Sequence, residues 1–167
     1  MSDRKTVRLQ RENARLQKEI AKEGGSEAHL QAQRWVVETV GDDVLLWSAT
    51  MIGAEGTPYD GQTYKLQLDF RGVDYPTRPP KVNFVGKIPF HANVYRSGDI
   101  CIDILGNQWS PIMKIRQIIT SLVSLLNEPN TSSPANSEAS RAYDADTEPN
   151  KPTFCKLVAA HYAGRKK

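Results

Sequence analysis

Residue types that mark metal centres, disulfide scaffolds and membrane anchors are scarce in this sequence. Two cysteines and three histidines occur in 167 residues, without a Cys-x-x-Cys pair, which disfavours a zinc site. No apolar run approaches the roughly 20 residues that span a bilayer, and the charged N-terminus lacks the apolar centre of a signal peptide. These absences predict no metal, no membrane and a cytoplasmic or nuclear protein whose thiols stay reduced.

Positive charge is concentrated near the N-terminus. Residues 1–23 contain strong helix formers and neither Gly nor Pro, which predicts a helix over 3–23. Spacings of four and three place six cations on one stripe of this helix: Arg4, Arg8, Arg11, Arg15, Lys18 and Lys22. The stripe is either a solvated face or a docking surface for an acidic partner. It has no interleaved aromatics, so nucleic acid is disfavoured.

Four strand-like segments follow the helix and are joined by short connections. Residues 63–70 alternate most regularly between apolar and polar side chains. The other strands are expected over 35–39, 44–52 and 81–85, and their succession predicts an antiparallel meander. Prolines in the segment 75–80 resemble a polyproline ligand, but the flanking strands favour an ordered loop.

Residues 86–111 have no regular periodicity and contain the cysteine Cys101. Long irregular connections in compact domains are usually functional or disordered, and the apolar residues around this cysteine argue against disorder. Helices are expected over 113–127, over 134–144 and after a cap at Thr153, the last with Cys155 in the core. The chain is thus predicted to be α+β: an N-terminal helix, a four-stranded antiparallel meander, a long active-site loop and three C-terminal helices.

Six groups of residues occur in the order typical of one family. They are 57–61 (TPYDG), Tyr75-Pro76 with 79–82 (PPKV), 91–93 (HAN), 98–105 (GDICIDIL), 109–111 (WSP), and 125–130 (LLNEPN) with Ser133-Pro134. Together they resemble the ubiquitin-conjugating enzymes over roughly residues 8–163. The resemblance implies one catalytic domain spanning 1–167.

The resemblance implies that Cys101 accepts ubiquitin from the activating enzyme as a thioester. The enzyme then transfers ubiquitin to a lysine with the help of a ubiquitin ligase. No metal or cofactor is implied, because the activating enzyme consumes the ATP. Alternatives are conjugation of another modifier such as SUMO, or a non-catalytic partner subunit. Such subunits lack the cysteine, and the cysteine signature of a papain-like hydrolase is absent.

Several residues near the cysteine match functional positions of the family. Asn93 matches an asparagine that stabilises the oxyanion or fixes the loop, and His91 matches a structural position. Asp103 either orients the acceptor or caps and packs a helix. Ser133 matches a gating position that holds aspartate or serine in the family, which raises regulation by phosphorylation. Ala92 stands where the family usually has proline, and it loosens that restraint.

Two partner surfaces are implied by the same resemblance. The surface for the activating enzyme consists of Arg8, Arg11, Arg15 and Lys18. The surface for a ligase consists of Thr77, Ser110, Pro111 and Ile112. Threonine at 77 favours RING-type over HECT-type ligases, because phenylalanine there is typical of HECT partners. A partner subunit that is itself a ubiquitin-conjugating variant is left open.

Overall fold

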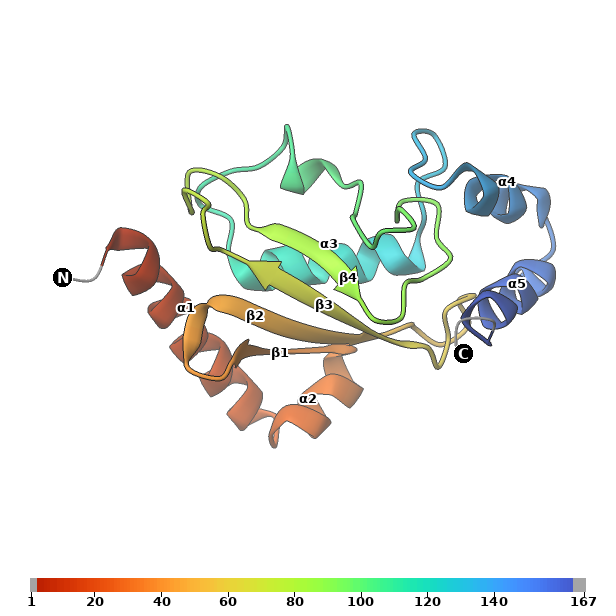
Figure 1. Ribbon diagram of the computed structural model, residues 1–167. Coiled ribbons are helices and arrows are strands. Elements are labelled where there is room, and N and C mark those ends of the chain that lie inside the picture. The colour runs from red at the N-terminus through yellow and green to blue at the C-terminus, as the bar shows by residue number, and fades with distance from the viewer. Residues whose placement is uncertain (1–2, 164–167) are drawn as a thin grey trace.

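A computed structural model describes residues 3–163, with side chains up to His161. Its elements follow the predicted α+β order (Figure 1). Helix α1 (Arg4–Lys22) precedes four strands, β1 (Trp35–Val40), β2 (Asp43–Ile52), β3 (Thr63–Asp69) and β4 (Lys81–Val85). A long loop leads to α3 (Ile115–Asn127), α4 (Ser137–Ala145) and α5 (Pro152–Ala163). Both ends of the predicted 1–167 domain extend beyond the described residues.

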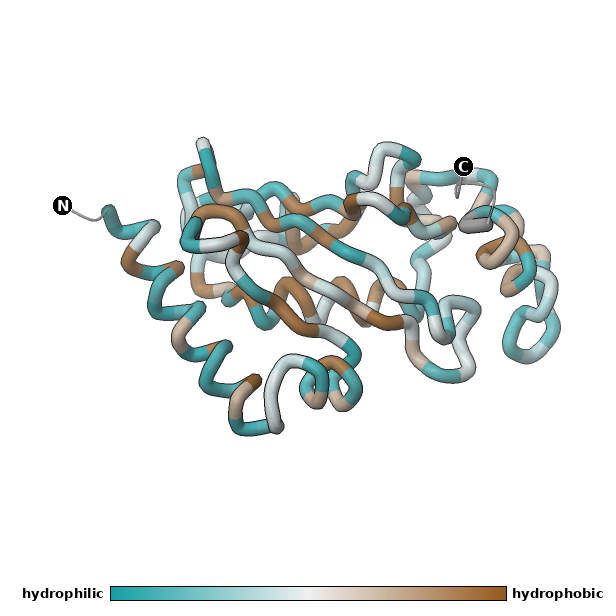
Figure 2. Tube along the Cα trace, turned by 60° about the horizontal axis from the view of Figure 1, so that its bottom comes forward, coloured by the Kyte–Doolittle hydropathy of each residue, from teal (hydrophilic) through white to brown (hydrophobic). Residues whose placement is uncertain are grey.

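The four strands form one antiparallel sheet in the order β1-β2-β3-β4, so the predicted meander is confirmed. Alternate residues of β2 and β3 share one buried face, on which Trp47 pairs with Leu68 and Ala49 with Leu66. Helix α3 covers this face with its apolar stripe: Ile115, Ile118, Ile119, Leu122 and Leu126. Figure 2 shows hydrophobic residues gathered in the strands and α3, while α1 is largely hydrophilic.

Helices α4 and α5 lie at one end of the sheet, and α1 lies at the other (Figure 1). Phe154 of α5 is fully buried and stacks on Phe90, with 5.8 Å between ring centroids. The prediction that Thr153 caps this helix is wrong, because the helix begins at Pro152. The carboxylate of Asp146 instead accepts a hydrogen bond of 2.9 Å from the Phe154 N–H.

Two further features differ from the sequence prediction. Helix α2 (Ser26–Gln33) was not predicted, because it buries only His29 and therefore has no apolar periodicity to recognise. Cys155 is half-buried rather than in the core, and its thiol donates to the Asn150 carbonyl oxygen at 3.3 Å.

The segment 75–80 is an ordered loop, as predicted. Tyr75 is buried, and its hydroxyl donates to the carboxylate of Glu12 at 2.5 Å. Within residues 3–163 no helix is long and apolar enough to span a membrane.

Candidate active site

The loop between β4 and α3 brings Cys101 next to Asn93. An antiparallel bridge joins Val94 to Ile100, and a turn closes the intervening segment, with the Tyr95 N–H bonding the Asp99 carbonyl oxygen at 2.8 Å. The Cys101 N–H then donates to the carbonyl oxygen of Asn93 at 2.8 Å. The backbone of this narrow hairpin therefore fixes the cysteine against the asparagine.

Gly98 attaches this hairpin to strand β4. Its carbonyl oxygen accepts from the Phe84 N–H at 2.8 Å, and its φ is +98°. A side-chain Cβ at this position would lie 2.3 Å from the Phe84 carbonyl oxygen. Only glycine combines this positive φ with such a close approach of two backbones.

The four residues predicted to be catalytic line one cleft. Cys101, Asn93, Asp103 and Ser133 surround a volume of about 440 Å³, together with Ile102, Gly106, Asn107, Leu125 and Asn130. Cys101 is exposed. The cleft thus presents a thiol, an amide, a carboxylate and a hydroxyl to one acceptor group. In the described part of the chain, no group of three or more His, Cys, Asp or Glu could hold a metal ion.

Asn93 ties the cysteine loop to the segment after α3. The side-chain Nδ2 donates to the Asn130 carbonyl oxygen at 2.7 Å, and Oδ1 accepts from the Asn130 N–H at 2.8 Å. These two bonds fix the loop, which is one of the two roles predicted for Asn93. However, an amide nitrogen carries two hydrogens, and within the described residues only one of them is bonded. The second N–H leaves the oxyanion role available as well.

His91 is fully buried and holds the loop through both ring nitrogens. Nε2 donates to the Leu125 carbonyl oxygen at 2.8 Å, and Nδ1 accepts from the Asn93 N–H at 2.9 Å. Burial lowers the pKa of His91 to about 4. A neutral imidazole with both nitrogens engaged and no exposed surface is unsuited to be a general base, and this geometry agrees with the predicted structural role.

The lowered pKa predicts an acid-sensitive loop. The unfolded chain has the ordinary histidine pKa of 6.5, so below this pH it binds a proton that the folded state does not bind until about pH 4. Stability should therefore fall as the pH drops through this window, by about 2 kcal/mol between pH 7 and pH 5. Urea unfolding at both pH values measures the loss. The variant His91→Gln should be less stable at pH 7 and lose less on acidification, and an equal loss in both proteins would contradict the prediction.

The segment that contains Ser133 is bonded to Ala92. The Ala92 carbonyl oxygen accepts from the N–H groups of Ala135 at 2.8 Å and Asn136 at 3.0 Å. Ala92 is itself fully buried. These bonds restrain the backbone at the position where the family usually has proline, while Ser133 remains exposed at the edge of the cleft.

Asp103 begins a short 3-10 helix, η1 (Asp103–Leu105), and its side chain is exposed. The carbonyl oxygen of Asp103 accepts from the Gly106 and Gln108 N–H groups, both at 2.9 Å. Within the described residues its carboxylate makes no capping hydrogen bond to η1. Asp103 also lines the cleft.

The predicted cations of α1 fall into two groups. Arg11, Arg15 and Lys18 are exposed. Arg8 is half-buried, and its guanidinium bonds the carbonyl oxygens of Pro111 and Met113. Helical spacing placed all four residues on one stripe, but it contains no information on the distant carbonyls that engage Arg8. Arg8 is thus bonded within the fold, whereas Arg11, Arg15 and Lys18 lie exposed.

The residues predicted to bind a ligase lie on two adjacent loops. Thr77 and Pro111 are exposed, Ser110 is half-buried and Ile112 has 83% of its surface exposed. The Trp109 indole N–H donates to the Pro76 carbonyl oxygen at 3.0 Å and joins the two loops.

Sequence reasoning missed two residues that build the site. Asn130 bonds Asn93 through its backbone, and only its place in a recognised motif could have pointed to it. Glu12 is a buried carboxylate that contacts Arg8, Tyr75 and the Ile115 N–H. Its spacing of four from Arg8 was a detectable signal for an ion pair, but not for its other partners.

The comparisons with known proteins agree on one family. The family model described as "ubiquitin-conjugating enzyme" matches residues 15–160. The ubiquitin-conjugating enzyme E2 2 of Yarrowia lipolytica is 52% identical over 104 residues, which cover 62% of this chain and 68% of the relative. The ubiquitin-conjugating enzyme E2 3 of Arabidopsis thaliana is 44% identical over 121 residues, which cover 72% and 79%.

A solved structure is similar over nearly its whole length. It is the crystal structure of the H. polymorpha ubiquitin-conjugating enzyme Pex4p in complex with the soluble domain of Pex22p. The TM-score is 0.82 at 25% sequence identity, and the match covers 96% of this chain and 97% of that chain.

Proposed function

The chain belongs to the ubiquitin-conjugating enzymes, transferases that act through a cysteine thioester, and from that premise we propose that Cys101 is the cysteine that carries ubiquitin. The observation that supports this assignment most is its position. Cys101 is exposed in the cleft that also presents Asn93, Asp103 and Ser133.

Cys155 is a poorer candidate for the nucleophile. It lies on α5, half-buried, and its thiol donates to the carbonyl oxygen of Asn150. Burial raises the pKa of Cys155, which lowers its thiolate fraction at neutral pH. Both features favour Cys101.

The first step is an exchange between two sulfur atoms. The thiolate of Cys101 attacks the carbonyl carbon of the thioester on the activating enzyme, a new C–S bond forms, and the activating enzyme leaves as a thiolate. A modest thiolate fraction in a well-placed complex is sufficient for this exchange. The engaged imidazole of His91 is therefore no obstacle, because this step requires no Cys–His pair.

The second step is attack by the acceptor lysine. Its amine must lose a proton, and the developing oxyanion must be stabilised. In the proposal, the unbonded N–H of Asn93 donates to the oxyanion, and the carboxylate of Asp103 orients the amine. Ser133 contributes a neutral hydroxyl at the edge of the cleft and assists deprotonation poorly.

The character of residue 133 should therefore tune the second step. Ser133→Asp, which also imitates the charge of a phosphate, should accelerate discharge of the thioester onto free lysine by up to about tenfold, because a carboxylate is a better base than a hydroxyl. Single-turnover discharge measures the rate. Ser137→Asp adds the same charge at the exposed start of α4, outside the cleft, and should change little. An unchanged rate for Ser133→Asp would contradict the gating role.

The proposed partner surfaces are taken from the family resemblance, and most of their residues are exposed. The family works with ubiquitin, an activating enzyme and a ligase, and in the proposal Arg11, Arg15 and Lys18 meet the activating enzyme. The ligase docks on the surface of Thr77, Ser110, Pro111 and Ile112, and the threonine favours a RING-type ligase. A cytoplasmic or nuclear location and a variant partner subunit remain proposals of the same kind.

The choice of modifier can be tested with the unmodified protein. It is incubated with ATP and either ubiquitin and its activating enzyme or SUMO and its activating enzyme, and the products are separated on a non-reducing gel. We expect an adduct in the ubiquitin reaction and none in the SUMO reaction, and the ubiquitin adduct should disappear on addition of thiol. An adduct with SUMO alone would overturn the choice of modifier, and no adduct with either would contradict the enzymatic proposal.

A further inference from the structure

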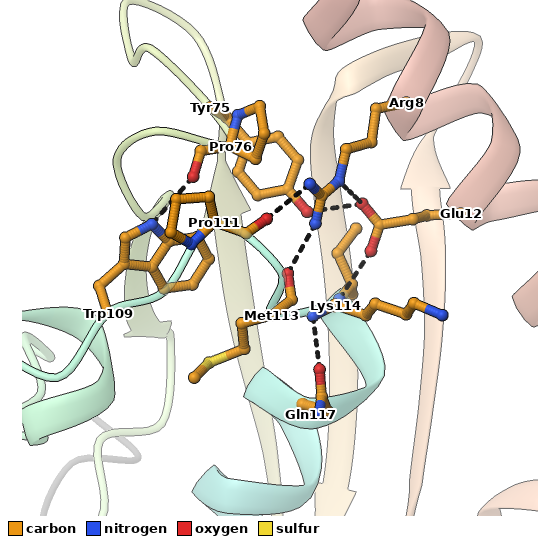
Figure 3. A network of polar contacts seen from close by, with 10 residues as sticks. Arg8, Glu12, Tyr75, Pro76, Trp109, Pro111, Met113, Lys114 and Gln117 are labelled. Carbon is orange, nitrogen blue, oxygen red and sulfur yellow. Dashed lines mark hydrogen bonds and ion pairs between the residues drawn. The ribbon is translucent and has the colours of Figure 1, made fainter.

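Arg8 holds the loop before α3 at two points. Its Nη1 donates to the Pro111 carbonyl oxygen at 2.6 Å, and its Nη2 donates to the Met113 carbonyl oxygen at 2.8 Å (Figure 3). Ile112 lies between these two carbonyl groups and has 83% of its surface exposed. The guanidinium therefore grips the backbone on both sides of the most exposed large apolar side chain among the described residues.

The position of Arg8 is itself fixed by Glu12 and Tyr75. The Arg8 Nε donates to Glu12 at 3.2 Å, and the guanidinium lies over the Tyr75 ring at 5.1 Å from its centroid. Burial and the neighbouring carboxylate raise the pKa of Tyr75, so its hydroxyl stays protonated and donates to Glu12. Figure 3 shows the three side chains converging on one point between α1 and the loops.

Glu12 also joins α1 to the start of α3. Its second carboxylate oxygen accepts from the Ile115 N–H at 2.8 Å. The first N–H groups of a helix have no partner within the helix, and a negative charge there is favourable. Glu12, which holds Arg8, is consequently bonded to both α1 and α3. The loop that ends at residue 114 is therefore fixed next to Arg8.

We propose that Arg8 is a positioning residue for the ligase: it presents Ile112 by clamping the carbonyl groups of Pro111 and Met113. The proposal rests on the proposed docking of a ligase at this loop. It assigns Arg8 a role in ligase-dependent transfer in place of a free charge for the activating enzyme. The fork of the guanidinium is required, because one group must reach two carbonyl oxygens and the Glu12 carboxylate together.

The test is the substitution Arg8→Lys, which keeps the charge but cannot span both carbonyls. The assay uses a RING ligase domain that accelerates the discharge of ubiquitin onto lysine from the thioester of the unsubstituted protein. The readout is the ligase concentration at half-maximal acceleration, with each rate divided by the ligase-free rate of the same variant. Loss of two charge-assisted bonds should raise this concentration by roughly five- to thirtyfold.

Arg116→Gln is the matched control. Arg116 also joins α3 to α1, through Glu19 at 2.8 Å, but it makes no contact with the loop of residues 109–113 among its bonds within the described chain. Its half-maximal concentration should stay within about twofold of the unmodified protein, because a surface ion pair contributes little. An equal rise for Arg116→Gln and Arg8→Lys would attribute the effect to loosened helices and overturn the inference.

Ile112→Ala separates this inference from the docking proposal beneath it. If Ile112→Ala leaves the half-maximal concentration unchanged, ligase docking at this loop is wrong. If it raises the concentration while Arg8→Lys does not, docking stands and the role of Arg8 is wrong. If Arg8 acts through Ile112, the half-maximal ligase concentration of the double variant should not exceed that of the more impaired single variant. Fully additive losses would contradict the inference.

Discussion

Replacing Cys101 with serine is expected to convert the thiol-sensitive ubiquitin adduct into one that survives reducing agent, and replacing it with alanine should abolish the adduct. An oxygen ester resists thiols, whereas a thioester exchanges with them. Alanine removes the nucleophile, so the loss should be complete. Because the side chain is exposed, neither substitution should unfold the protein. Gels run with and without reducing agent measure both outcomes.

Cys155→Ala supplies the control for this prediction. The residue lies on α5 and does not line the cleft. Its loss should leave the adduct intact. If the adduct instead persists in Cys101→Ala and vanishes in Cys155→Ala, the assignment of the nucleophile is wrong.

The second large effect is expected at Asn93, in the transfer step. Asn93→Ala removes the N–H available to the oxyanion and both bonds to Asn130. Discharge onto free lysine should fall by roughly 10²-fold or more, because the oxyanion develops when the amine attacks. Formation of the thioester should be much less affected, since the thiolate exchange is easier. Single-turnover measurements of charging and of discharge separate the two steps.

Asn93→Asp distinguishes the two roles of this side chain. The carboxylate can still accept from the Asn130 N–H, but it has no N–H to donate and adds a negative charge near the oxyanion. A loop-fixing role alone predicts a loss of discharge smaller than in Asn93→Ala, because the carboxylate keeps the bond from the Asn130 N–H and loses only the bond to the Asn130 carbonyl oxygen. A contribution to the oxyanion predicts a loss at least as large as in Asn93→Ala.

The sheet and α3 could be predicted from the sequence because each buries one complete face. In β3 every second side chain is buried, and in α3 the buried residues recur at threes and fours. These periods identify a strand and a helix directly. Helix α2 could not be found in this way, because a helix that buries only His29 is held by tertiary contacts rather than by an apolar stripe.

The site was predicted through its motifs, and the contacts that build it were not. Motif order brought Asn93, Asp103 and Ser133 to attention, and the structure places all three with Cys101 in one cleft. The two hydrogen bonds between Asn93 and Asn130 join a side chain to backbone groups 37 residues away. No periodic pattern in the sequence predicts a contact of this kind. Arg8 illustrates the same limit, because its partners lie more than 100 residues along the chain.

Four hydrogen bonds join residues 92–93 to residues 130–136, the segment that contains Ser133. Two of them converge on the Ala92 carbonyl oxygen, and two join Asn93 to the backbone of Asn130. Moving either end of the 130–136 segment away from residues 92–93 strains the bonds at its other end. The segment should therefore open as a single cooperative unit rather than fray residue by residue. Ser133 should then keep or lose its place at the edge of the cleft in one step, at a frequency set by the stability of four hydrogen bonds.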